Sequence, residues 1–106
     1  MRKEDLFQYA INLVSEITDI TKENIMSKSR KIEYVDARYM IVYILHNHGL
    51  YYDEIAGMMK CTPANIRTII TNMKYRQTGN RSFRNKLEIT SKYLENKIHT
   101  EDEAMQ

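Results

Sequence analysis

Two stretches of this 106-residue chain carry side chains suited to hydrogen bonding with a large anion. The first is the run 27–31, which reads Ser-Lys-Ser-Arg-Lys and offers cations and hydroxyl groups close together. Such groups pair readily with phosphate oxygens. The second is the segment 62–76, where amide, hydroxyl and guanidinium side chains recur among apolar residues. Side chains of these types can hydrogen-bond to the edges of nucleic-acid bases.

The segment 63–76 is predicted to be a helix with one buried face. Its apolar residues recur at the i, i+3, i+4 and i+7 positions of an amphipathic helix: Ile66, Ile69, Ile70 and Met73. Thr62 is a favourable N-cap, and Pro63 suits the first helical position because an N–H there would have no helical partner. The polar residues of the segment should therefore face solvent.

A shorter helix is predicted over residues 51–59, and the two together read as a helix-turn-helix. The small residue Ala56 lets the two helices cross closely between Ile55 and Ile66. In a helix-turn-helix, the first turns of the second helix enter the major groove of DNA. We therefore expect base contacts from Ala64, Asn65, Arg67 and Thr68, and phosphate contacts from Thr62 and Lys74. A plain helical hairpin within a bundle fits the same spacing and stays open as the alternative.

The remaining elements are also predicted to be helical. Periodicity or capping residues place helices over 4–18, 21–26, 32–46 and 81–97, with Thr21 capping the second and Gly49 ending the third. Three glycines and one proline supply little turn chemistry for a sheet of many hairpins. The predicted fold is one all-α domain of five or six helices over residues 1–99. It contains the helix-turn-helix at about 51–76 and is followed by a loose acidic tail over 100–106.

Charge is unevenly distributed along the chain, although the net charge is only +2. Residues 27–98 carry 13 basic and 6 acidic side chains, whereas residues 1–26 and 99–106 are net acidic. A basic region of this kind suits a polyanionic partner. Ordinary charge scatter over a solvated surface is the alternative, and we prefer it for the basic helix predicted over 81–97.

One part of the chain resembles a known family. Residues 23–31 read Glu-Asn-Ile-Met-Ser-Lys-Ser-Arg-Lys, and Ala37-Arg38 follows in the next predicted helix. Residues 53–56, Asp-Glu-Ile-Ala, open the predicted helix-turn-helix. Together these motifs, spread over residues 12–76, resemble the C-terminal DNA-binding domain of the bacterial replication initiator DnaA, which has a Trp-repressor-like fold.

The resemblance implies a helical domain that binds double-stranded DNA. The second helix of the helix-turn-helix would enter the major groove, and Arg30 would reach into the adjacent minor groove. Phosphate contacts would come from Lys28, Lys31 and Arg38. These roles are implied by the resemblance and not by the spacing of the residues.

The chain also departs from that family in ways that bear on function. Residues 60–66 lack the Arg-Asp-His of the family's recognition signature and are one residue shorter. Asp36 stands where a basic residue is common, which would weaken the edge that faces phosphate. No glycine-rich phosphate loop occurs, so no ATPase activity is expected.

We interpret the sequence as a DNA-binding protein with sequence preference. It would act as a stand-alone regulator of transcription or as an accessory factor in DNA replication. The missing Arg-Asp-His motif and the acidic Asp36 motivate an alternative, a protein-interaction module that keeps the fold but does not bind DNA.

Other kinds of chemistry find less support in the residues. His46, His48 and Cys61 are too few for a four-ligand zinc site, and histidine is favoured at a helix C-terminus by the helix dipole. The eight tyrosines are accompanied by no marked activating base, so nucleophilic catalysis is not expected. We predict no enzyme activity, no cofactor, no metal ion and no small-molecule substrate.

Location and assembly are less strongly determined. No apolar run approaches the ~18 residues of a membrane span, and the opening Met-Arg-Lys-Glu-Asp is unlike a signal peptide. The single cysteine, Cys61, fits a reducing compartment, so a cytoplasmic protein without a membrane partner is expected. The acidic amphipathic helix over 4–18 leaves a homodimer open, and a protein partner stays open as well.

Overall fold

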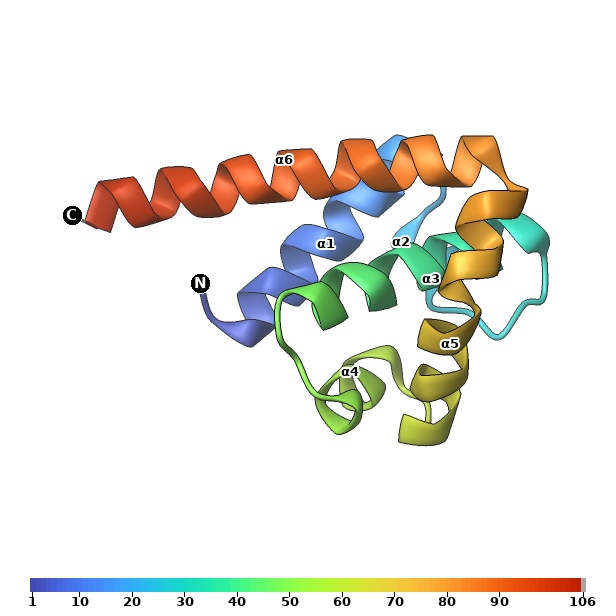
Figure 1. Ribbon diagram of the computed structural model, residues 1–106. Helices are drawn as coiled ribbons and strands as arrows, with labels where there is room; N and C mark the ends of the chain where they lie inside the picture. Colours follow the sequence, from blue (N-terminus) through green and yellow to red (C-terminus); the bar gives the residue numbers. More distant parts are fainter. Residues whose placement is uncertain (106) are drawn as a thin grey trace.

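Six helices build the protein in this computed structural model, which describes the backbone of residues 1–105 and the side chains of residues 1–100 (Figure 1). They are α1 (Lys3–Thr18), α2 (Lys22–Ile25), α3 (Ile32–Asn47), α4 (Tyr52–Met59), α5 (Pro63–Gly79) and α6 (Arg81–Met105). No strand occurs within residues 1–105. The prediction of an all-α chain with five or six helices is confirmed, while the specific DnaA-like arrangement stays a prediction.

Helix α3 lies at the centre because it is apolar on nearly every side. Its buried residues are Ala37, Met40, Ile41, Val42, Ile44 and Leu45. All five other helices pack against α3, or against a neighbour that does, and α1 makes the most extensive contact with it. In Figure 1, α6 crosses above α3, α4 lies below it, and α5 runs down beside it. The core therefore fixes where the two helices of the helix-turn-helix sit.

Capping residues set several helix boundaries at the predicted positions. The Thr21 hydroxyl oxygen accepts a hydrogen bond from the Asn24 N–H (3.2 Å) and begins α2. The Thr62 hydroxyl oxygen accepts one from the Asn65 N–H (3.1 Å) and begins α5. Gly49, with φ of 91°, follows the end of α3 in the left-handed region that glycine tolerates best.

The last two helices are longer than predicted. The helices predicted over 63–76 and 81–97 are separated by Asn80 alone, because α5 continues through Gly79. The Asn80 side-chain oxygen then accepts a hydrogen bond from the Phe83 N–H (3.0 Å) and starts α6. Helix α6 continues to Met105, so the backbone of residues 100–105 is helical. Glutamate, alanine and methionine are good helix formers, which favours this extension. That the acidic tail is loose stays a prediction.

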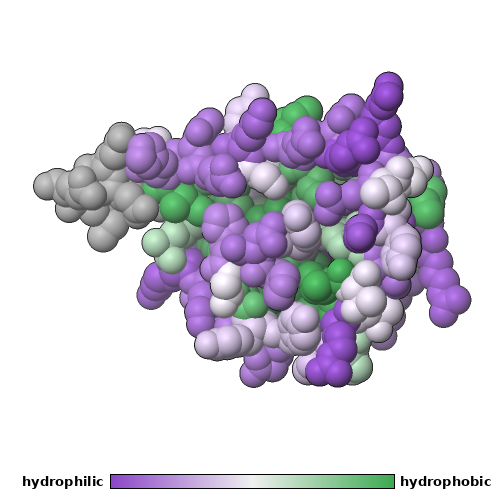
Figure 2. Space-filling model, in the orientation of Figure 1, coloured by the Kyte–Doolittle hydropathy of each residue, from purple (hydrophilic) through white to green (hydrophobic). Residues whose placement is uncertain are grey.

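Hydrophilic side chains cover most of the molecular face shown in Figure 2. Apolar side chains show mainly in the seams between helices. Ile32, at the first position of α3, is an apolar residue with 60% of its surface exposed. None of the helices in the described part of the chain has the length and apolar character needed to cross a membrane.

Candidate nucleic-acid interface

The predicted helix-turn-helix corresponds to α4 and α5, which are joined by residues 60–62 and pack against each other. Ile55 and Ile66 are fully buried where the helices meet, and Ala56 between them is 3% exposed. The Cys61 N–H donates to the Ala56 carbonyl (3.0 Å) and closes the turn. Lys60 reverses the chain direction with φ of 58° and ψ of 47°, a left-handed conformation that is unusual for a residue with a Cβ.

The start of α4 is tied to the N-terminal helix. A Glu54 carboxylate oxygen accepts a hydrogen bond from the Tyr51 N–H (2.9 Å), and the other is paired with the Lys3 ammonium group of α1. The hydrogen bond from Lys3 and the one from the Tyr51 backbone lower the pKa of Glu54. The hydrogen bond with Glu54 raises the pKa of Lys3. The carboxylate thus caps α4 and holds it against α1.

Helix α5 turns its apolar side inward and its polar side to solvent, as predicted. Ile66, Ile69 and Met73 are buried. All six residues expected to contact DNA from this helix or its cap are exposed: Thr62, Ala64, Asn65, Arg67, Thr68 and Lys74. The Thr68 hydroxyl donates to the Ala64 carbonyl (3.1 Å), so its proton is used within the helix. Thr68 can therefore offer a partner only its oxygen lone pairs and its methyl group.

The basic loop, residues 27–31, is shaped by its own serines. The Ser27 hydroxyl donates to the Asn24 carbonyl (2.6 Å) and accepts from the Ser29 N–H (3.4 Å). The Ser29 hydroxyl oxygen accepts from the Lys31 N–H (3.2 Å). Serine side chains commonly replace backbone partners in this way. Because the serines satisfy the backbone, the side chains of Lys28, Arg30 and Lys31 stay exposed.

Two guanidinium nitrogens of Arg38 donate hydrogen bonds within the protein. Its Nε donates to the Ile25 carbonyl (2.7 Å), and its Nη2 donates to the Ser29 carbonyl. The side chain is half-buried, and burial lowers the pKa of the guanidinium group. These contacts make Arg38 a brace between the end of α2 and the basic loop. This bracing role was missed from the sequence because nothing local marks the two carbonyls as partners. The phosphate contact that the resemblance implied stays a prediction.

The basic loop and the start of α5 face each other across a hollow of about 290 Å³. Ser27 and Lys28 line it from the loop, and Lys60 and Asn65 line it from the helix-turn-helix. Figure 1 shows the loop before α3 on the same side of the molecule as α5. The floor is apolar and comes from Met26, Val42, Met59, Ile66 and Ile69. The structure thus brings together residues that lie up to 43 positions apart in the sequence.

The Asp36 carboxylate is paired with an arginine of the protein itself. We predicted that it would weaken a phosphate-facing edge, but its Oδ1 lies 2.5 Å from Arg76 Nη1 at the junction of α3 and α5. The Arg76 guanidinium also lies 4.0 Å from the centre of the Tyr39 ring. Burial raises the pKa of Asp36, although the charge of Arg76 opposes the shift. Asp36 therefore serves helix packing, and its charge is neutralised locally.

Lys31 has a position different from that of its neighbours in the loop. It precedes α3 as its N-cap residue, and its Nζ lies 4.0 Å from the Glu33 carboxylate. The same atom lies 5.3 Å from the centre of the Tyr34 ring. These contacts draw Lys31 towards α3, so Lys28 and Arg30 are the loop cations without such a contact in the described residues.

The chain was compared with protein-family models and with curated protein sequences. No protein-family model matches the chain, and no curated protein sequence matches it. Within the described residues, no group of three His, Cys, Asp or Glu side chains is placed to hold a metal ion.

Proposed function

We propose that the protein binds double-stranded DNA, with α5 in the major groove and the basic loop on the adjacent minor groove. Asn65, Arg67 and Thr68, with the small Ala64, would meet base edges. Arg30 would enter the minor groove, and Lys28, Thr62 and Lys74 would contact phosphates. Lys31 could add a phosphate contact by leaving Glu33. The biological role that fits is a regulator of transcription or an accessory factor in DNA replication.

The observation that supports this proposal most is the shared hollow. Lys28 of the basic loop and Asn65 of α5 line the same cavity, although one residue precedes the central helix and the other follows the helix-turn-helix turn. A cationic loop beside the first turn of an exposed polar helix suits a duplex, because phosphates flank every major groove. The exposed α5 residues would then be held in register by the loop.

Charge near this surface supports the same proposal. Lys28 and Lys60 line the hollow, and Arg30 of the basic loop and Arg67 of α5 are exposed. Asp36, whose negative charge was an argument against DNA binding in the sequence, is paired with Arg76 between α3 and α5. The main acidic side chain left near the helix-turn-helix is the exposed Asp53.

Salt dependence tests the proposal directly. If four to six phosphate contacts form, log affinity should fall with log salt at a slope of about −4 to −5. Fluorescence anisotropy with a labelled duplex, chosen by selection from random oligonucleotides, would measure this slope. Lys28→Ala should make the slope less steep by about 1, whereas the matched change Lys92→Ala on the exposed side of α6 should not alter it.

A second candidate, a protein-interaction module, is favoured by one observation. The floor of the shared hollow is apolar, and a peptide side chain could fill it. Such a module would show no duplex binding even at low salt. A flat response in the anisotropy experiment would therefore favour this second candidate over DNA binding.

A further inference from the structure

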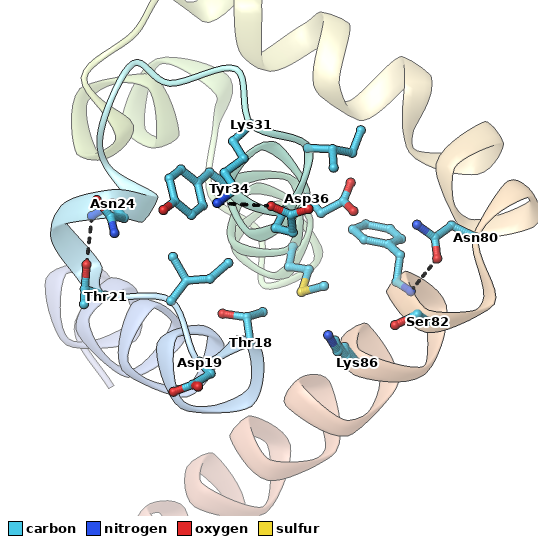
Figure 3. Close-up of a pocket in the computed structure, with 15 residues that line it drawn as sticks. Thr18, Asp19, Thr21, Asn24, Lys31, Tyr34, Asp36, Asn80, Ser82 and Lys86 are labelled. Atoms are coloured by element: carbon cyan, nitrogen blue, oxygen red, sulfur yellow. Dashed lines mark hydrogen bonds and ion pairs between the residues drawn. The ribbon is translucent and has the colours of Figure 1, made fainter.

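A second and larger hollow, of about 500 Å³, lies where the α1–α2 turn, the start of α3 and the start of α6 meet (Figure 3). It shares no lining residue with the hollow beside α5. Its volume falls within the range typical of small-molecule sites, about 300–1,000 Å³. Of the residues that line it, the DNA-binding proposal uses only Lys31.

Apolar side chains supply one part of its lining. Met40 and Phe83 form the floor and are almost fully buried, and Ile20 lies beside them half-buried. Ile32 borders the same hollow with 60% of its surface exposed, so folding of the chain does not bury this apolar side chain. An apolar group seated here would cover Ile32, and covering apolar surface is favourable.

Of the charged residues that line the hollow, Lys31, Glu33 and Asp36 are in ion pairs, whereas Asp19 and Lys86 have none with residues 1–100. Asp36 is paired with Arg76, and Glu33 lies near Lys31. Lys86, from the second turn of α6, is half-buried and has no carboxylate within ion-pair distance among the described residues. Figure 3 shows its amine directed towards the hollow, with Ser82 beside it. The charge of Lys86 also acts on Asp36, but within the described residues no hydrogen bond uses the ammonium protons, so these protons can be donated to an anion.

The number of charges selects the kind of anion. Asp19, Glu33 and Asp36 all line the hollow, so a second negative charge on a ligand would be repelled. A monoanion needs only Lys86. We infer that this hollow binds a small organic monocarboxylate, with its carboxylate on the Lys86 ammonium group and the Ser82 hydroxyl, and its apolar body on Ile32 and Phe83.

The probe we choose is 3-phenylpropanoate, with 3-phenylpropanamide as its neutral counterpart. Titration into the ¹⁵N-labelled full chain, followed by amide NMR shifts, should give saturable changes around residues 20, 32, 40 and 82–86. We expect a dissociation constant of about 1 mM or tighter for the carboxylate, and binding at least about tenfold weaker for the amide. Equal binding of the two probes, or no saturable shift from either, would overturn the inference.

Two variants locate the site. Lys86→Met should weaken carboxylate binding by about tenfold or more, while the matched Lys92→Met, also on α6, should leave it unchanged. Ile32→Ala, at a position too exposed to carry the core, should weaken binding by about threefold. If Lys86→Met binds the carboxylate as tightly as the unaltered protein, the assignment fails. None of these readouts involves DNA, so they stand or fall independently of the DNA-binding proposal.

Discussion

Arg76 Nη1 lies 2.5 Å from Asp36 Oδ1 and joins the last turns of α5 to the first turns of α3. The two side chains are 22% and 16% exposed, so water screens the pair only partly. Removing either partner, by Asp36→Asn or Arg76→Met, should lower the free energy of unfolding by about 1–3 kcal/mol, between the values for exposed and buried pairs. Urea unfolding of both single variants and the double variant would measure it. Strictly additive losses would show that the pair contributes no coupling.

Glu54 should make stability depend on pH in a defined direction. Its pKa is lowered below the ordinary value of 4.5 by the hydrogen bonds from Lys3 and from the Tyr51 backbone. The stability it contributes is therefore complete above pH 4.5 and is lost as pH falls through the lower folded-state pKa. Glu54→Gln should lower Tm near neutral pH and have little effect in acid. Glu88→Gln, at an exposed position of α6, is the control, and a Glu54→Gln loss that persists unchanged in acid would contradict the assignment.

Lys60 is a position where glycine should improve on the natural residue. Its φ of 58° places the Cβ against the backbone in the left-handed region. Lys60→Gly should raise the free energy of unfolding by about 1 kcal/mol, because glycine adopts this region without that strain. Lys60→Ala keeps the Cβ and should bring no such gain. Chemical denaturation of the two variants would show whether the turn, and not the loss of a charge, governs the change.

Arg38 should hold the basic loop whether or not DNA is present. Arg38→Met removes the hydrogen bonds to the Ile25 carbonyl at the end of α2 and to the Ser29 carbonyl of the loop. Amide hydrogen exchange at Ser29 and Lys31 in the free protein should then accelerate by about tenfold or more, because the loop opens more often. Arg84→Met on α6 offers a matched control. A residue that served only as a phosphate contact would leave exchange in the free protein unchanged.

Base recognition should separate from backbone contact in two further variants. Asn65→Ala should lose about 1–3 kcal/mol of discrimination at one base pair of a selected site, while the control Asn72→Ala, further along α5, should not. Arg30→Ala should weaken binding most beside A·T-rich flanks, where a narrow minor groove attracts arginine. Anisotropy titrations against point-substituted duplexes would measure both effects. Unchanged affinity in both variants would rule out the proposed contact surface.

Features that depend on neighbours in the chain could be predicted from the sequence. Thr21 and Thr62 cap their helices as expected, because an N-cap needs only a hydroxyl three residues before its donor. The inward face of α5 could also be predicted, because it depends only on the spacing of apolar residues along one helix. The predicted ends of α5 and α6 were wrong, because Gly79 and the residues after position 97 continue helices that local signals do not forbid.

Partners that come from distant segments could not be predicted. From its type alone, the Arg38 side chain could contact phosphate, solvent or carbonyl oxygens. Its actual partners depend on the path that the chain takes over it, from the end of α2 through the basic loop. The same holds for Asp36, whose partner Arg76 is 40 residues away. Lys3 and Glu54 are separated by 51 residues, so their pairing depends on how α1 crosses the molecule. In each case the side-chain type was informative but its partner was fixed by the tertiary fold.

The serine hydrogen bonds and the Arg38 brace also have a kinetic consequence. A loop already held in one shape has little conformational entropy left to lose when an anion arrives, so it is preorganised for binding. Association should then resemble the docking of two rigid surfaces, with a rate set by diffusion and charge attraction and not by a slow folding step. Residues 27–31 would work as a fixed clamp.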